Sequence, residues 1–171
     1  MATATKARRG TAAKAKPAAV AKRGAPATRT RKKAAPRRKK QTLVIDRAAD
    51  GKFVGGGLRD QFVYRHFGIE EATGREYSAH VIRAADGKEP IRHHVHPDCE
   101  FLLVYVLKGW VKFWYEGHGE EKLTAGDVHM LPPGIKHAVT AWSRNLEMLE
   151  ITHPADYQSI ELTDRQIARL G

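Results

Sequence analysis

The segment RHHVHPDCEFLLVYVLKG, residues 92–109, places three histidines and a glutamate directly before an apolar run. Alternate residues of a β-strand share one face, so His94 and His96 would point together while the residue between them points away. Residues 97–99 fit a three-residue hairpin loop, across which Glu100 would face His96 with Cβ atoms about 5 Å apart. Imidazole and carboxylate groups both bind transition metals. The spacing therefore predicts that His94, His96 and Glu100 converge as metal ligands.

The apolar run that follows predicts the environment of this cluster. If residues 108–109 form a two-residue turn, the flanking strands pair and place six large residues on the face of Glu100. These residues are Leu102, Val104, Val106, Val111, Phe113 and Tyr115. The opposite face would carry Phe101, Leu103, Tyr105, Leu107, Trp110 and Trp114. So much apolar surface predicts cover by a second sheet or subunit, and we expect a homodimer.

The chain from Thr42 onward has the pattern of an all-β domain, with short apolar runs separated by Gly, Asp and Pro. Strands are predicted at 42–46, 61–67, 76–84, 91–96, 100–107, 110–116, 120–124, 128–132, 136–142 and 146–152. Residues 68–74 predict a helical turn, and residues 162–170 predict a short terminal helix. Short strands without a long helix favour a β-sandwich or barrel over an α/β fold.

Charge divides the chain into two parts. Residues 1–40 contain 15 of the 30 Lys and Arg residues and no acid, whereas residues 41–171 contain 15 basic and 19 acidic residues, a net charge of −4. The first part has too few apolar residues to form a core, so we expect a disordered tail over 1–41, a barrel over 42–155 and an extension over 156–171. The tail could bind nucleic acid through its positive charge, or it could be only a solvated arm.

A second motif strengthens the metal hypothesis. In GDVHMLPPGIKH, residues 126–137, the glycines, the first proline and the last histidine match G-x5-P-x-G-x2-H, the second cupin motif, through Gly126, Pro132, Gly134 and His137. His94, His96 and Glu100 match H-x-H-x3-E of the first cupin motif. The sequence resembles the cupin superfamily over roughly 42–155. It departs from the family pattern at Gly87, Gly109 and Ala141.

The resemblance implies a double-stranded β-helix, or jelly-roll barrel, that holds a divalent transition metal with His94, His96, Glu100 and His137. Such a ligand set suits Fe, Mn, Ni, Co or Zn. It implies a small-molecule ligand in the barrel and a small metalloenzyme, dioxygenase-like or isomerase-like, that acts on an oxygenated compound. The alternative is a ligand- or metal-sensing module, without enzymatic activity, that its basic tail tethers to nucleic acid. Neither the substrate nor a catalytic residue follows from the motifs.

The remaining chemistry-bearing residues point less strongly to function. His80 could share the barrel face and hydrogen-bond a ligand, and His129 is a similar candidate, whereas His118 fits an exposed turn between glycines. The single cysteine, Cys99, excludes an internal disulfide. No apolar run approaches the ~20 residues of a membrane span. We expect a cytoplasmic protein, with a mitochondrial transit peptide as an alternative reading of the tail.

Overall fold

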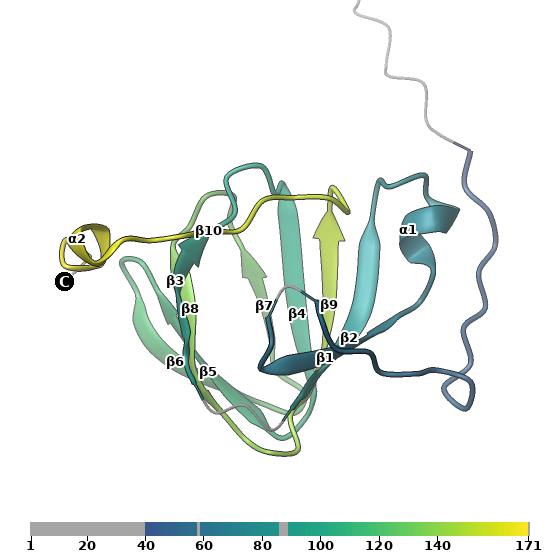
Figure 1. The fold of residues 1–171 in the computed structure, drawn as a ribbon, viewed down its shortest axis with the longest axis horizontal. Coiled ribbons are helices and arrows are strands. Elements are labelled where there is room, and N and C mark those ends of the chain that lie inside the picture. Colours follow the sequence, from purple (N-terminus) through teal and green to yellow (C-terminus); the bar gives the residue numbers. More distant parts are fainter. Residues whose placement is uncertain (1–39, 58, 86–88, 171) are drawn as a thin grey trace, which may run out of the picture. The chain divides into compact units, whose positions relative to one another are not determined.

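Two antiparallel five-stranded sheets face each other in the computed structural model, which describes residues 40–57, 59–85 and 89–170 (Figure 1). The first sheet has the order β1-β2-β9-β4-β7 and the second β10-β3-β8-β5-β6. The first comprises Phe62–His66, Ser78–Ala84, Glu147–His153, Phe101–Lys108 and Val128–Leu131, in sheet order. The second comprises Ile160–Glu161, Ile91–Val95, His137–Trp142, Trp110–Tyr115 and Gly119–Thr124. The predicted all-β jelly-roll fold is confirmed.

The two helices are short. Helix α1, Ile69–Ala72, follows Gly68, whose φ of 70° favours glycine, and it lies within the predicted turn at 68–74. Helix α2, Asp164–Ile167, begins after Thr163 within the predicted segment 162–170. Thr163 and Gln166 cap its first turn reciprocally. Neither helix is long and apolar enough to cross a membrane, and no other helix of the described residues is either.

The core confirms the predicted alternation of side chains. Along β4, Leu102, Val104 and Val106 are buried, and the same holds for Val111, Phe113 and Tyr115 along β5. Val106 and Val111 are fully buried, which contributes about 1.5–3 kcal/mol for each side chain. The predicted hydrophobic interior is therefore present.

The predicted hairpins, however, are wrong. Strand β4 pairs with β7 and β9, and β5 pairs with β6 and β8, so the chain passes from one sheet to the other at the turn between β4 and β5. Gly109 makes this crossing at a φ of 74°, where an added Cβ would lie 2.2 Å from Ser143 Oγ. Strands β3 and β4 also belong to different sheets. Their residues share the interior because they face each other across the core.

The ends of the domain also differ from the prediction. Residues 42–46 form no strand, and Leu43 and Ile45 are 87% and 70% exposed, because no neighbouring strand pairs with their backbone. Strand β10 was not predicted, since a pair of residues is too short to show a periodic pattern. It brings part of the predicted extension into the second sheet. Residues 1–39 of the predicted tail lie outside the described residues.

Candidate metal centre

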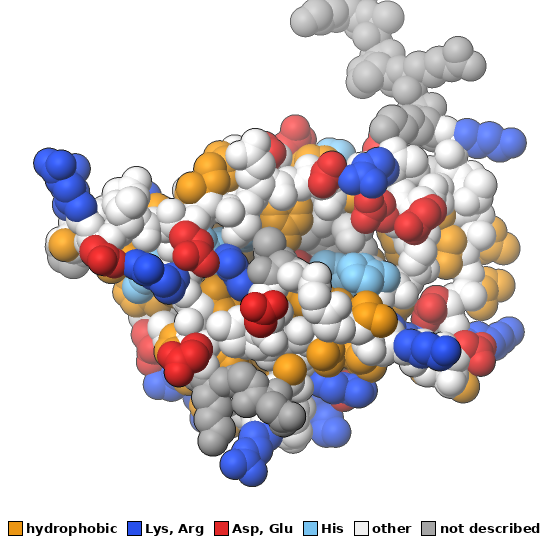
Figure 2. Space-filling model, in the orientation of Figure 1, with side chains coloured by type: hydrophobic (Ala, Val, Ile, Leu, Met, Phe, Trp, Pro, Cys, Tyr) orange, Lys and Arg blue, Asp and Glu red, His pale blue; other side chains and the backbone are white. Residues whose placement is uncertain are grey.

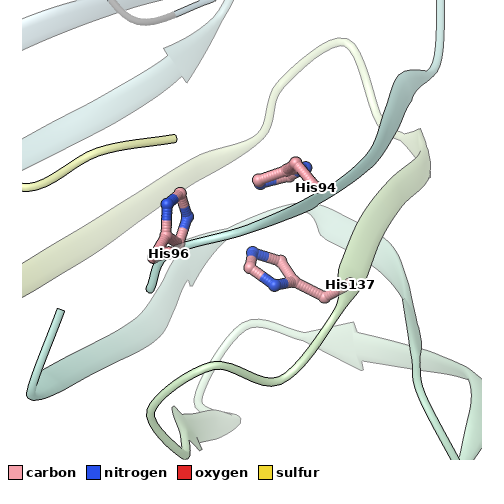
Figure 3. A group of neighbouring side chains, drawn as sticks. All are labelled: His94, His96 and His137. Carbon is pink, nitrogen blue, oxygen red and sulfur yellow. The ribbon is translucent and has the colours of Figure 1, made fainter. Parts of the chain in front are cut away.

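Three histidines converge on the inner face of the second sheet (Figure 3). His94 lies on β3 opposite His137, the first residue of β8, and His96 follows the end of β3. Each offers a ring nitrogen, and these nitrogens lie within 4.8 Å of one another. All three side chains are buried. The three-histidine group joins two segments that are far apart in the sequence.

A backbone carbonyl orients each ring of the three-histidine group. Nδ1 lies 2.8 Å from Arg92 O in His94, 3.0 Å from Gln158 O in His96 and 3.1 Å from Ile135 O in His137. A carbonyl oxygen only accepts hydrogen bonds, so each Nδ1 must carry the proton and donate it. The neutral ring then presents an unprotonated Nε2. Histidine metal ligands are typically held in this way, with the second nitrogen donating to a carbonyl or carboxylate.

The same rings are neutral over a wide pH range. Burial, together with the neighbouring His137, lowers the pKa of His94 to about 3. Burial also lowers the pKa of His137 to about 4 and lowers that of His96. A neutral imidazole is the form that binds metal. The site is therefore ready to accept a cation at neutral pH without first releasing protons.

Glu100 does not join this group. Its side chain is 75% exposed, and Oε2 lies 3.5 Å from His153 Nε2. The prediction placed Glu100 opposite His96 in a hairpin, but β3 and β4 lie in different sheets. Because β4 begins only at Phe101, Glu100 lies in the connecting bend and its side chain does not follow the alternation of the strand. The structure thus brings together three of the four predicted ligands.

A cavity of about 250 Å³ lies between the sheets and reaches the three-histidine group. One wall is the inner face of the second sheet, with His94, His96 and His137. The other wall is the first sheet, which contributes His80 and His129. Both of these histidines were predicted to share the barrel face, whereas His118 is exposed. Phe113, Leu131, Val139 and other apolar residues complete the lining.

Sequence reasoning missed Glu150, an acidic residue on the inner face of the first sheet. It lies on β9, where Met148 and Thr152 also point inward. Oε1 of Glu150 is 3.2 Å from His80 Nε2 and accepts a hydrogen bond of 3.4 Å from the hydroxyl of Tyr157. The alternation in LEMLEIT would have placed Glu150 on the face of Met148, and this was the available signal.

The electrostatics of Glu150 are those of an ionised carboxylate. Burial raises its pKa, but the contact with His80 and the neighbouring imidazoles outweigh burial, so the pKa lies below its ordinary value. Burial raises the pKa of Tyr157, and the charge of Glu150 raises it further. The Tyr157 hydroxyl thus stays protonated and donates to Glu150. The cavity combines neutral histidines on one wall with a negative charge on the other.

The chain after β9 covers one end of the cavity. In Figure 1 this yellow segment crosses from β9 to β10, between the two sheets. It supplies Tyr157 to the lining and the carbonyl of Gln158 to His96. Figure 2 shows histidine side chains in the middle of the face drawn, bordered by apolar and charged groups. Part of the predicted extension is therefore part of the site.

The fold and the site together define a jelly-roll protein with a three-histidine group in its barrel. The cupin domain family model matches residues 80–152, which span β2 to β9 and contain all three histidines. Residues 80–152 therefore match a cupin domain, as the motifs of the sequence predicted. No curated protein matches the sequence.

Solved structures agree on the fold. The polyketide cyclase RemF from Streptomyces resistomycificus superposes with a TM-score of 0.57 at 15% identity, covering 72% of this chain and 89% of RemF. KdgF from Halomonas sp. gives 0.52 at 16% identity, covering 66% of this chain and 94% of KdgF. A mutant of Bacillus subtilis oxalate decarboxylase OxdC gives 0.52 at 16% identity, covering 75% of this chain but only 35% of its own.

Proposed function

We propose that this cupin is a small metalloenzyme that binds one divalent transition ion through His94, His96 and His137 and acts on a small oxygenated compound in the barrel. The observation that carries the proposal is the set of three Nδ1 contacts to backbone carbonyls, which leaves three Nε2 atoms free beside a cavity. Buried polar atoms without such a role would be costly in a barrel core.

The donor set fits a transition ion. Imidazole nitrogen is a ligand for Zn, Cu, Fe and Ni, and the general affinity of such sites for divalent ions rises from Mn through Fe, Co and Ni to Cu. Three protein ligands leave one position open in a four-coordinate site and three in a six-coordinate site. An ion bound here would supply Lewis acidity toward a carbonyl or hydroxyl oxygen of a substrate. The cavity volume of about 250 Å³ suits a small molecule.

The test is metal content after gentle purification, measured by elemental analysis, and affinity for ions offered to the chelator-treated protein. Bacillus subtilis oxalate decarboxylase, whose fold is similar, has Mn(II) centres, so Mn(II) belongs among the ions offered. We expect one ion per chain in the wild type. His137→Ala should bind at least about 100-fold more weakly, since even losing the hydrogen-bond partner of a ligand costs about 10–100-fold.

Two variants serve as controls for this test. His118→Ala removes an exposed histidine and should bind metal as the wild type does. Glu100→Gln examines the fourth predicted ligand, and because its carboxylate is exposed beside His153, we expect unchanged affinity. A wild type that neither contains nor takes up stoichiometric metal would refute the proposal.

A further inference from the structure

A row of polar side chains crosses the first sheet on its inner face. The register pairs His66 with His80, His80 with Glu150, Glu150 with Val104, and Val104 with His129. Four of these five neighbouring positions therefore carry titratable groups, and all five line the cavity. A jelly-roll core needs only apolar residues at such positions. This polar row lies on the wall that faces the three-histidine group.

Polar atoms on this wall lack partners within the chain. Among the described residues, His129 Nε2 and Thr152 Oγ1 are buried and accept or donate no hydrogen bond. Nε2 of His80 is within 3.2 Å of Glu150 Oε1 but outside hydrogen-bond geometry. Leaving a buried polar group without a hydrogen bond destabilises the fold, so native proteins rarely do so unless a ligand or ordered water supplies the partner. The wall is thus suited to a polar molecule inside the cavity.

Glu150 has the arrangement of a proton acceptor. Both of its contacts, to His80 and to Tyr157, fall on Oε1. Oε2 has no partner among the described residues, and Glu150 lines the cavity. Its side chain is only 14% exposed, so water screens it weakly. The carboxylate lines the same cavity as His96 and His137, which lie on the opposite wall.

From this geometry we infer that Glu150 is the proton acceptor of the cavity and that the reaction is a proton transfer on a small oxo or hydroxyoxo compound. The inference deepens the proposed function, on which it rests. It selects the isomerase-like chemistry over insertion of oxygen. The structure assigns His80 and Tyr157 as positioning residues, which hold Oε1 and leave Oε2 for the substrate.

The step balances without an oxidant. The C–H bond beside a carbonyl breaks, and its proton goes to Glu150 Oε2. Its electron pair forms the C=C bond of an enolate while the carbonyl π pair moves to oxygen. In a hydroxyoxo compound, the hydroxyl proton passes to the former carbonyl oxygen, the hydroxyl oxygen becomes the new carbonyl, and the proton on Glu150 adds to the former carbonyl carbon, which completes an isomerisation and restores the carboxylate. In a simple oxo compound, the proton returns to the same carbon, which gives hydrogen exchange without isomerisation. A cation held by the three histidines would stabilise the negative charge that develops on the oxygen, so that even a carboxylate of low basicity can act as the base.

The number of protons released when a probe binds provides a test that does not depend on catalytic turnover. The probe is acetohydroxamic acid, which loses a proton when it chelates a metal as an enolate-like anion. We expect calorimetric titration of the metal-loaded protein, in buffers of different ionisation enthalpy, to show less proton release from the wild type than from Glu150→Gln, because the hydroxamate anion bound beside Oε2 favours protonation of Glu150. Glu150→Gln should release about one proton per probe bound. The matched control, Glu147→Gln, changes a glutamate on the same strand that pairs with Arg83, and it should behave as the wild type.

A second measurement follows the exchange of carbon-bound hydrogen. The metal-loaded protein is incubated in D2O with pyruvate, 2-oxobutyrate or hydroxyacetone, and the proton signal beside the carbonyl is followed by NMR. We expect Glu150→Gln to slow protein-dependent exchange by about 10²–10⁴-fold, the usual contribution of a general base.

Metal content separates the two proposals. Equal metal in wild type and Glu150→Gln, together with equal proton release, would overturn the role of Glu150 and leave the metalloenzyme intact. Loss of metal from Glu150→Gln would also overturn it, since Glu150 would then be a ligand. No exchange of any probe by a metal-loaded wild type would overturn the proton-transfer assignment. Absence of metal from the wild type would instead refute the proposed function.

Discussion

At the scale of the residue, backbone carbonyls determine which ring nitrogen carries the proton in each member of the three-histidine group. Carbonyl groups of Arg92, Gln158 and Ile135 each hold one Nδ1, so the orientation of the rings does not depend on a bound ion. Preformed ligands lose little conformational freedom on binding, which raises affinity. The cost is that three imidazoles must remain neutral inside a barrel.

Because the folded protein keeps these imidazoles neutral, we expect the metal-free protein to lose stability in acid. The pKa of His94 is lowered to about 3, and the pKa values of His129 and His137 to about 4, chiefly by burial. An unfolded histidine titrates near 6.5, so below that pH the unfolded chain binds protons that the folded chain does not. The free energy of unfolding should therefore fall from about pH 6.5 toward pH 4, by up to about 1.4 kcal/mol per pH unit for each such histidine.

Urea denaturation of the chelator-treated protein at pH 7.5 and pH 5.5 checks this prediction. His129→Gln should make the dependence on pH shallower, because one buried neutral imidazole is removed. His118→Ala, at an exposed position, should leave it unchanged. Equal stability of the wild type at the two pH values would contradict the prediction.

At the scale of the element, the segment between β9 and β10 links the site to the rim of the barrel. The Asp98 carboxylate accepts a hydrogen bond of 2.8 Å from the backbone N–H of Gln158, whose carbonyl holds His96. Asp98→Ala should release this segment and lower metal affinity by about 10-fold, as for other losses of support around a ligand. Chelator competition measures the effect. Asp98→Asn keeps an acceptor oxygen and should lose less, and Asp50→Ala, at an exposed turn, should lose nothing.

Strands β4 and β7 carry an exposed apolar face. On the outside of the first sheet, Tyr105 pairs with Val128 and Leu103 with Met130. Tyr105 is 39% exposed, and Val128 and Met130 are each 55% exposed. We propose that this face forms a homodimer, because adjacent apolar side chains on a sheet gain by leaving water.

Sedimentation at micromolar concentration tests the dimer. Val128→Lys combined with Met130→Lys should give a monomer, and Leu43→Lys, which changes an exposed leucine outside the strands of this sheet, should leave the dimer in place. A monomeric wild type would contradict the proposal.

The strands also show what a sequence can reveal about such a barrel. Alternation is local, so it placed Leu102, Val104 and Val106 inside without knowledge of their partners. Pairing is not local, and adjacent strands of a jelly roll often lie in opposite sheets, so the hairpin that brought Glu100 to His96 was wrong. The place of Glu150 beside His80 depends on the pairing of β2 with β9, which no short motif records.

At the scale of the whole molecule, charge predicts a second activity for the full chain. Residues 1–40 carry 15 positive charges and no acid. We propose that this part binds nucleic acid through phosphate contacts, whose strength falls by about 10³–10⁵ between 50 and 200 mM salt if ~6–10 phosphates are neutralised. A DNA mobility shift should be seen for the full chain and lost for a version that begins at Gln41. Identical shifts for both would contradict the proposal.

The segment after β9 has a consequence for anyone who trims this protein to its recognisable core. The family match ends at residue 152, yet Gln158 and Tyr157 lie beyond it. A protein cut at that boundary would retain every histidine of the motifs. The His96 ring, however, would lose its hydrogen-bond partner, and one end of the cavity would be uncovered. Such a minimal version would contain both motifs and still lack part of the cavity lining, because Tyr157 and Gln158 belong to no motif.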